Sequence, residues 1–408
     1  MTRQPAANAA PHAGTAGEVF RAFLRLGLTS FGGPIAHLGY FRNELVLRRG
    51  WVDDRRYAEI VALAQFLPGP ASSQVGFALG LMRAGPLGAI MAWLAFTLPS
   101  AILLVAFAYG AALLDNPVGD GIVAGLKIVA VAIVAQAVWG MARTLAPDAR
   151  RATIAVGAVA IALLAAGSLG QLAAILLGAL AGLLLCRAPE GADGEAAADL
   201  SPPVSRRAGG VALAVFAALL VLLPPVAAAV GTRLTDIADG FYRAGALVFG
   251  GGHVMLPLLE AEAVADGWVS ADQFLAGYGA AQAVPGPLFT FAAYLGALAA
   301  PGAAGILTAA VALVAVFLPG LLLMVGVLPF WNAVRTRPTA RALIRGANAA
   351  VVGILAAALY DPVFVTAVVD PASFTLAAVC FVLLMAWRMP AWGVVLVGAL
   401  GGLLITLR

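Results

Sequence analysis

Apolar stretches long enough to cross a lipid bilayer recur along almost the whole chain of 408 residues. A transmembrane α-helix needs about 18 or more mostly apolar residues to cross roughly 30 Å of hydrocarbon. Only 11% of the residues are charged and 62% are hydrophobic, whereas an average soluble domain has roughly 25% charged residues. These stretches do not alternate with a period of two. A water-soluble fold is therefore excluded, and the sequence predicts an all-α polytopic membrane protein.

The apolar segments fall into two sets of six, separated by a polar linker and one extra segment. We expect a polar tail at 1–16, a first repeat at 17–186, a hydrophilic linker at 187–209, a connecting transmembrane helix at 210–230 and a second repeat at 235–408. The tail has no apolar region typical of a signal peptide, so the N-terminus is expected to be retained in the cytoplasm.

The two sets of six are copies of each other, because rare residues coincide at a nearly constant offset. At an offset of 218 residues, Arg25, Phe31, Gly32, Gly33 and Glu44 coincide with Arg243, Phe249, Gly250, Gly251 and Glu262. At an offset of 217, Trp51, Gln65, Pro68, Gly69 and Pro70 coincide with Trp268, Gln282, Pro285, Gly286 and Pro287. We therefore predict an internal duplication.

The arginines indicate that the second copy is inverted. The loop at 143–151 carries three arginines, and its counterpart at 361–371 carries none. Conversely, the loop at 112–120 has none, and its counterpart at 331–345 has four. Since positive loops face the cytoplasm, equivalent loops lie on opposite sides of the membrane. A single connecting segment between two copies of six segments would likewise invert the second copy relative to the first.

The five arginines at 42–56 favour re-entrant segments. If all 13 segments crossed the membrane, this loop would lie outside, against the positive-inside rule. We expect instead that the first two segments of each copy enter and leave by the same face. The stretch at 57–82, broken at Pro68 and Pro70, leaves two arms of about 12 residues, each roughly 18 Å long if helical.

Glycine and proline clusters interrupt apolar sequence at matching places in the two copies. Such breaks leave backbone N–H and C=O groups unpaired, which hydrocarbon tolerates only beside a cavity or a ligand. A helix that restarts after a break directs N–H groups and a positive dipole end at the gap, which suits an anion. Kinks and close packing are the alternative explanation. The candidate substrate-binding residues at the breaks are Ser30, Gly32, Gly33, Gly69, Gly250, Gly251 and Gly286.

Three cations in apolar sequence are further candidates. Arg25 and Arg243 each precede the Phe-Gly-Gly break by six residues, and a guanidinium offers donors that fit a tetrahedral oxyanion. Lys127 is the one charged side chain in its apolar run. Snorkelling to the interface is the alternative for all three.

Polar side chains close to the Pro-Gly-Pro turns complete the candidate set: Gln65, Ser72, Ser73, Gln282 and Thr290. Their hydroxyls either donate to an oxyanion or bond back to helix carbonyls, which is the more common use. Glu44 and Glu262 are candidate proton carriers, although the sequence around them favours solvated loops. His253 is a third candidate for proton coupling, but His37 and His253 do not occupy equivalent positions.

No metal-ligand cluster, nucleotide-phosphate loop or nucleophile motif occurs in the sequence. We therefore expect no cofactor, no metal and no enzymatic activity. The net charge of +4 is interpreted as a topology signal, and no nucleic-acid partner is expected.

The paired motifs resemble the chromate ion transporter (CHR) family in its long two-domain form. They are Phe-Gly-Gly-Pro at 31–34, Phe-Gly-Gly-Gly at 249–252, and the two Pro-Gly-Pro turns. The resemblance implies a multi-pass transporter of the bacterial inner membrane that exports chromate and confers chromate resistance, driven by the membrane potential or a proton gradient, with sulfate as a competing anion. Gly252 stands where the first copy has Pro34, so the two breaks need not bind identically.

These observations predict a secondary transporter in which the two copies move about a central anion site, with the bilayer as its solvent. The alternatives are an uptake permease for sulfate or another oxyanion, and an anion channel in which the breaks form a filter. A homodimer is one assembly that the sequence allows.

Overall fold

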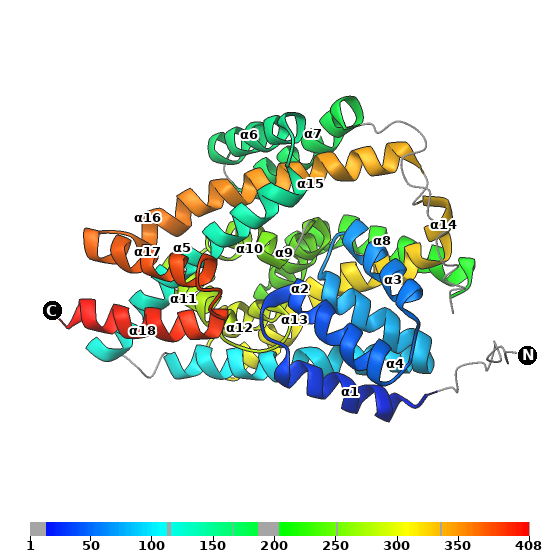
Figure 1. The fold of residues 1–408 in the computed structure, drawn as a ribbon, viewed down its shortest axis with the longest axis horizontal. Coiled ribbons are helices and arrows are strands. Elements are labelled where there is room, and N and C mark those ends of the chain that lie inside the picture. The colour runs from blue at the N-terminus through cyan, green and yellow to red at the C-terminus, as the bar shows by residue number, and fades with distance from the viewer. Residues whose placement is uncertain are drawn as a thin grey trace, which may run out of the picture.

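The computed structural model describes residues 14–111, 116–165, 167–186, 204–249, 252–334 and 337–407. Within these ranges every regular element is a helix. The long helices run mostly along the longest axis of the molecule, with the start of α1 and the end of α18 toward opposite ends (Figure 1). The prediction of an all-α polytopic membrane protein is therefore confirmed.

Five described helical stretches are long and apolar enough to cross a bilayer. They contain α4 (Ala71–Ala111), α5 (Pro117–Leu145), α8 (Arg206–Val230), α13 (Ala304–Val327) and α15 (Pro338–Ala358). In α8 only 11% of the apolar window is buried, so this connecting helix presents most of its apolar side chains to the surroundings. A helix that is apolar all round and outside the protein core fits contact with lipid.

The first copy begins with short helices joined by breaks. These are α1 (Ala16–Thr29), α2 (Gly33–Phe41), the π-helical η1 (Arg42–Arg48) and α3 (Asp54–Phe66). Helix α4 follows the Pro-Gly-Pro turn and is interrupted again at Ala84 and Gly85, where the backbone is not helical. The arm before the turn thus has 13 residues, close to the length expected from the sequence.

The second copy begins in the same way. Its short elements are α9 (Arg233–Leu247), η2 (Gly252–Val254), α10 (Met255–Ala263), α11 (Ala271–Ala281), η3 (Leu288–Thr290) and α12 (Phe291–Leu298). Gly69 and Gly286, the central residues of the two Pro-Gly-Pro turns, have φ values of 118° and 101°. Only glycine adopts this backbone conformation without strain, which explains the residue type at both turns.

Short helices complete each copy. They are α6 (Ala149–Leu164) and α7 (Ser168–Leu185) in the first, and η4 (Leu328–Phe330), α14 (Trp331–Val334), η5 (Leu359–Phe364), α16 (Val365–Ala367), α17 (Pro371–Met385) and α18 (Ala391–Thr406) in the second. Asp148 caps α6 by accepting from the N–H of Arg151, and Asp370 caps α17 by accepting from the N–H of Ser373. Side-chain caps of this kind satisfy N–H groups that have no partner inside the helix.

Small residues let helices of the two copies pack closely, and they do so at matching positions. Gly125 of α5 lies against Gly398 of α18, and Gly346 of α15 lies against Gly178 of α7. A Cβ atom at any of these glycines would overlap the facing helix. Close approach through small residues is the usual mode of helix packing in membranes. Each copy therefore contributes one long helix that packs on the last helix of the other copy.

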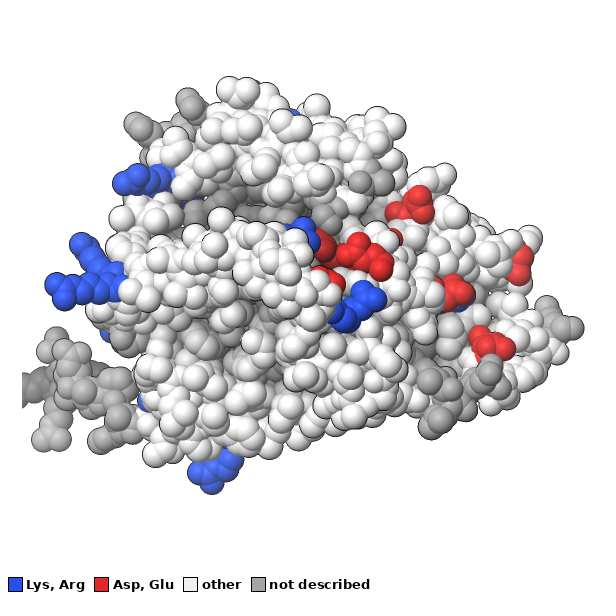
Figure 2. All heavy atoms as spheres, turned by 180° about the vertical axis from the view of Figure 1, so that it is seen from behind, with Lys and Arg blue, Asp and Glu red and all other residues white. Residues whose placement is uncertain are grey.

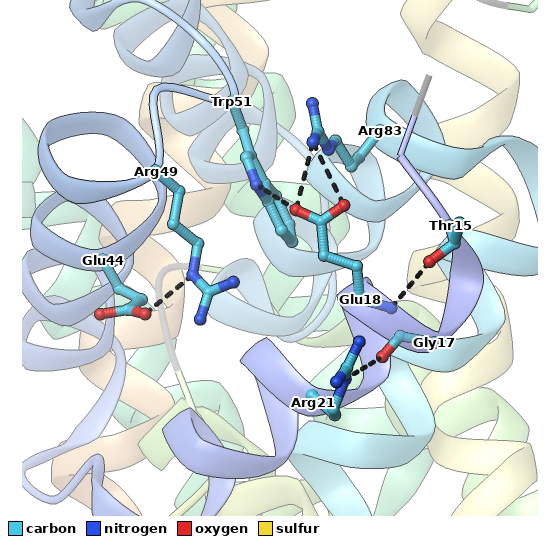
Figure 3. A network of polar contacts seen from close by, with 8 residues as sticks. All are labelled: Thr15, Gly17, Glu18, Arg21, Glu44, Arg49, Trp51 and Arg83. Atoms are coloured by element: carbon cyan, nitrogen blue, oxygen red, sulfur yellow. Dashed lines mark hydrogen bonds and ion pairs between the residues drawn. The ribbon is translucent and has the colours of Figure 1, made fainter. Parts of the chain in front are cut away.

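Glu18 brings three distant points of the first copy together. Its carboxylate accepts hydrogen bonds from the indole N–H of Trp51 at 3.1 Å and from Nη2 of Arg83 at 3.1 Å (Figure 3). The start of α1, the loop before α3 and the interruption in α4 thus lie at one place. The two broken pairs of segments in the first copy therefore have neighbouring ends.

Charged side chains are distributed unevenly along the long axis. On the face shown in Figure 2, most Lys and Arg side chains gather at one end, and most Asp and Glu side chains lie toward the other. The basic end corresponds to the end at which α1 begins in Figure 1. Such a polarity is typical of a membrane protein whose basic end faces the cytoplasm.

Candidate functional site

The two breaks and the two turns meet through a reciprocal pair of backbone hydrogen bonds. The N–H of Gly69 donates to the carbonyl oxygen of Val248 at 2.7 Å, and the N–H of Gly286 donates to that of Ser30 at 2.9 Å. Val248 follows Ser30 by 218 residues, and Gly286 follows Gly69 by 217. The turn of each copy is thus bonded to the residue that precedes the Phe-Gly-Gly break of the other copy.

The same turns lie very close to the long helices. A Cβ atom on Gly69 would lie 2.8 Å from the Cα of Gly320 in α13, and one on Gly286 would lie 2.8 Å from Oγ of Ser100 in α4. Gln74 stabilises the contact between Gly69 and Gly320, because its Nε2 donates to the carbonyls of Pro68 and Gly320, both at 2.9 Å. The centre of the molecule is therefore packed without room for larger side chains at the turns.

A cavity of about 220 Å³ lies beside these contacts and is lined by both copies. Five of its lining residues are candidates from the sequence, namely Gly32, Gly33, His253, Gln282 and Gly286. The others come from α5, from the end of α11 and the segment up to η3, and from the end of α17 to the start of α18: Ile133, Gln136, Ala281, Val284, Leu288, Leu384, Met389, Pro390 and Ala391. The structure therefore gathers break residues from both copies around one space.

The polar groups at this cavity are suited to an anion. Helix α2 begins at Gly33 after the left-handed Gly32, so the first N–H groups of the helix have no partner within it. Within the described residues, Nε2 of Gln282 is buried and has no hydrogen-bond acceptor. Backbone and amide N–H donors of this kind hold oxyanions at helix N-termini.

The predicted cations do not line the cavity. Arg25 is exposed on α1, and no described carboxylate lies within ion-pairing distance of it. Nζ of Lys127 pairs with Oδ1 of Asp272 at 2.8 Å. Nη2 of Arg243 pairs with Asp239 at 3.1 Å and with Glu262 at 2.9 Å. Any charge that these residues supply acts from outside the cavity wall.

The predicted hydroxyl groups divide into two sets. Oγ of Ser72 lies 3.3 Å from Nδ1 of His37, and Oγ1 of Thr290 donates to the carbonyl of Pro287 at 2.8 Å. Thr290 thus shows the common use of a hydroxyl beside a helix break. The hydroxyls of Ser30 and Ser73 are buried and have no partner among the described residues.

The two matched glutamines are in different environments. Gln282 lines the cavity, whereas Gln65, at the equivalent place in the first copy, is exposed on α3. The equivalent pair of break glycines, Gly250 and Gly251, lies outside the described residues.

The matched acids Glu44 and Glu262 are buried in helical segments. The expectation of solvated loops is therefore wrong. Glu44 accepts from Arg48 at 2.6 Å and from Arg49 at 2.8 Å. Burial alone would raise the pKa of Glu44, but the hydrogen bond from Arg49 and the charges of Arg49, Arg48 and Arg25 outweigh it and lower this pKa.

His253 contacts Tyr278 at the edge of the cavity. Its Nδ1 lies 2.8 Å from the hydroxyl oxygen of Tyr278, which is fully buried. His37 bonds Ser72 instead, so the two histidines differ in partner as well as in sequence position.

Four residues near the turns, the cavity and the ion pairs of Arg243 were not predicted from the sequence: Gln74, Gln136, Asp239 and Tyr278. Gln74 and Gln136 are amides inside long apolar helices, and an isolated amide in such a run is a usable signal of a buried polar contact. Asp239 is a buried acid on α9. Nothing in the sequence marks Tyr278 as a partner of His253.

Comparison with known proteins gives a consistent result. The sequence model of a family described as Chromate transporter matches residues 17–183 and 235–403. A chromate transport protein of Pseudomonas aeruginosa is 29% identical over 391 residues, which cover 94% of this chain and 90% of the relative. A probable chromate transport protein of Synechococcus elongatus is 29% identical over 363 residues, covering 84% and 83%. The chromate transport protein of Cupriavidus metallidurans is 28% identical over 386 residues, covering 92% and 90%. No solved structure matches the chain.

Proposed function

The chain belongs to the chromate transporter family, and we propose that it is a secondary transporter that exports chromate across the bacterial cytoplasmic membrane and thereby confers chromate resistance. The cavity between the two copies supports this proposal, because it is lined by residues at the breaks of both copies. Inverted-repeat transporters bind their substrates at such a place, beside interrupted helices near the middle of the membrane. The proposal includes two inverted repeats at 17–186 and 235–408, joined by α8.

Chromate is held in the cavity by neutral donors. The first N–H groups of α2 and the amide of Gln282 face the dianion, and Gln136 adds a second amide from α5. Arg25 precedes the break by six residues, which is about 9 Å along a helix. It attracts the dianion toward the cavity from the surface. Neutral donors inside and a cation outside allow the anion to bind without being trapped.

We expect the reciprocal contacts to couple the movements of the two copies during alternating access. When the two copies rock about the cavity, the bonds from Gly69 to Val248 and from Gly286 to Ser30 mark the points about which the breaks move. Coupling requires that the two facing states bind the anion with different affinity. Sulfate has nearly the same charge and shape as chromate, so we expect it to compete.

Transport by purified protein in proteoliposomes tests the proposal. A carrier accumulates chromate against its concentration gradient when a gradient of protons or potential is imposed, and an uncoupler abolishes this accumulation. A channel conducts chromate only down its electrochemical gradient. Accumulation of sulfate without chromate transport would favour the permease alternative.

A further inference from the structure

A cluster on α9 and α10 places two buried carboxylates on one half-buried guanidinium. Nη2 of Arg243 lies 3.1 Å from Oδ2 of Asp239 and 2.9 Å from Oε2 of Glu262. The side chains of Asp239 and Glu262 are only 9% and 7% exposed. Among the described residues, Oδ1 of Asp239 and Nε of Arg243 are buried and have no hydrogen-bond partner. Asp239 thus keeps one carboxylate oxygen away from both water and protein donors.

The first copy has the opposite charge at the equivalent place. Arg21 stands 218 residues before Asp239, while Arg25 and Glu44 match Arg243 and Glu262. Figure 3 shows Arg21 bonded to the carbonyl of Gly17, and Glu44 bonded to Arg49. The first copy therefore surrounds its single acid with arginines, whereas the second surrounds its single arginine with acids.

The surroundings of the cluster contain few other charges. Helix α9 packs against α8, α10 and α13, and α13 carries no ionisable residue. Arg206 and Arg207 are in the first turn of α8, while Tyr242 of α9 meets α8 at Phe216. The remaining charged residues of these elements are Arg233 and Asp236 on α9 and Glu260 on α10, with Asp266 in the loop that follows.

Glu262 of α10 packs closely against α9. A Cβ atom on Gly240 would lie 2.8 Å from Oε2 of Glu262 and 3.3 Å from the ring of Trp268. Arg233 stacks over that ring, 5.6 Å from its centroid. Glu262 therefore lies at the contact between α9 and α10, where a change in the charge of the cluster acts on both helices.

We propose that Asp239, Arg243 and Glu262 form the proton-binding site that couples chromate transport to the proton gradient, a proposal that rests on the transporter function above. A proton binds the free oxygen of Asp239, and Arg243 remains charged and paired with Glu262. Burying a carboxylate oxygen without a donor is costly, and protonation removes that cost. The reaction is a proton transfer alone, so no bond other than the O–H bond is made or broken.

The cluster is connected to the cavity through α9. This helix ends at Leu247, and the next residue, Val248, accepts the hydrogen bond from Gly69 of the first copy. A change in the ion pairs of Arg243 alters the position of α9 relative to α10, and with it the break that lies between the copies. A proton thus binds the two facing states with different affinity, as coupling requires.

The test compares Asp239→Asn with wild-type protein in proteoliposomes, using two assays. The first measures chromate accumulation driven by an imposed pH gradient, and the second measures chromate–chromate exchange without a pH gradient. We expect the variant to lose at least about tenfold in driven accumulation and to keep exchange within about twofold, because exchange requires no proton step. Glu262→Gln is the second variant, and the same pattern is expected.

Asp266→Asn is the control, since Asp266 is exposed in the loop after α10 and forms no ion pair among the described residues. It should keep both activities. The proposal is overturned if Asp239→Asn and Glu262→Gln keep driven accumulation, or if both lose exchange and accumulation equally. A wild-type protein that transports no chromate in either assay contradicts the transporter function itself, so the two failures are distinguishable.

Discussion

The backbone N–H of Gly69 donates to the carbonyl oxygen of Val248 at 2.7 Å, which joins the turn of one copy to the break of the other. The equivalent bond from Gly286 to Ser30 makes the relationship reciprocal. The substrate site that we propose beside these bonds belongs to neither copy alone. Changes at either turn should therefore affect one shared site.

Gly286→Ala should reduce transport at least about tenfold. The φ of Gly286 is 101°, and a Cβ atom would lie 2.8 Å from Oγ of Ser100. A non-glycine residue in such a conformation costs about 1–3 kcal/mol. Gly210→Ala is the control, because no atom lies within 4 Å of a Cβ at that position. Initial rates of chromate uptake into vesicles measure the effect, and equal rates for the two variants would show that the turn tolerates a side chain.

Gln282→Ala should weaken chromate binding by about tenfold to 150-fold, because loss of one hydrogen bond to a charged group costs roughly 1.5–3 kcal/mol. Gln282 lines the cavity, whereas Gln65 occupies the equivalent place in the first copy and is exposed. Gln65→Ala should therefore leave KM within about twofold, as surface substitutions usually do. The ratio of the two KM values for chromate is the measurement. A larger effect at Gln65 would show that Gln65, and not Gln282, contacts the anion.

Arg25→Gln should raise KM several-fold at low ionic strength and have less effect at high ionic strength. Arg25 is exposed, and salt screens interactions between exposed charges beyond about 10 Å at 0.1 M. Arg143→Gln, at another exposed arginine, controls for the loss of one positive charge. If transport and affinity are unchanged in Arg25→Gln at all salt concentrations, Arg25 has no part in attracting the anion.

Glu44→Gln should lower stability at neutral pH and have a smaller effect in acid. The pKa of Glu44 in the folded protein is lower than its ordinary value. Its ionised form therefore stabilises the protein above the unfolded pKa of about 4.3, and this contribution is lost as the pH falls through the folded pKa. Thermal unfolding in detergent from pH 7 downward should show the wild-type and variant curves converging. Asp54→Asn, at an exposed ion pair, should change stability much less.

The sequence predicted the membrane fold because apolar length and charge scarcity are properties of the chain alone. It also identified both turns, because proline and glycine are rare in apolar segments and occur here at matching positions. Side-chain partners were harder to predict. Glu44 and Glu262 were expected in solvated loops, yet both are buried, because arginines distant by 4 to 19 residues pair with them.

The duplication also concealed differences between the copies. Matching positions suggested matching roles for Gln65 and Gln282, but only Gln282 lines the cavity. Asp239 was missed because the equivalent residue in the first copy is Arg21, so a search for identical pairs passes over it. Tertiary packing determines which member of a pair faces the cavity, and the residue type at a single position does not reveal that packing.

The location of the bound anion is the most direct test of the proposed binding site. Chromium scatters anomalously, so crystals of the protein grown with chromate identify the anion without reference to the protein density. A chromate site formed by both copies predicts an anomalous peak in the cavity between Gly33, Gln136 and Gln282. A peak at the surface pocket lined by Arg150, Arg151 and Arg345, with none in the cavity, would contradict it.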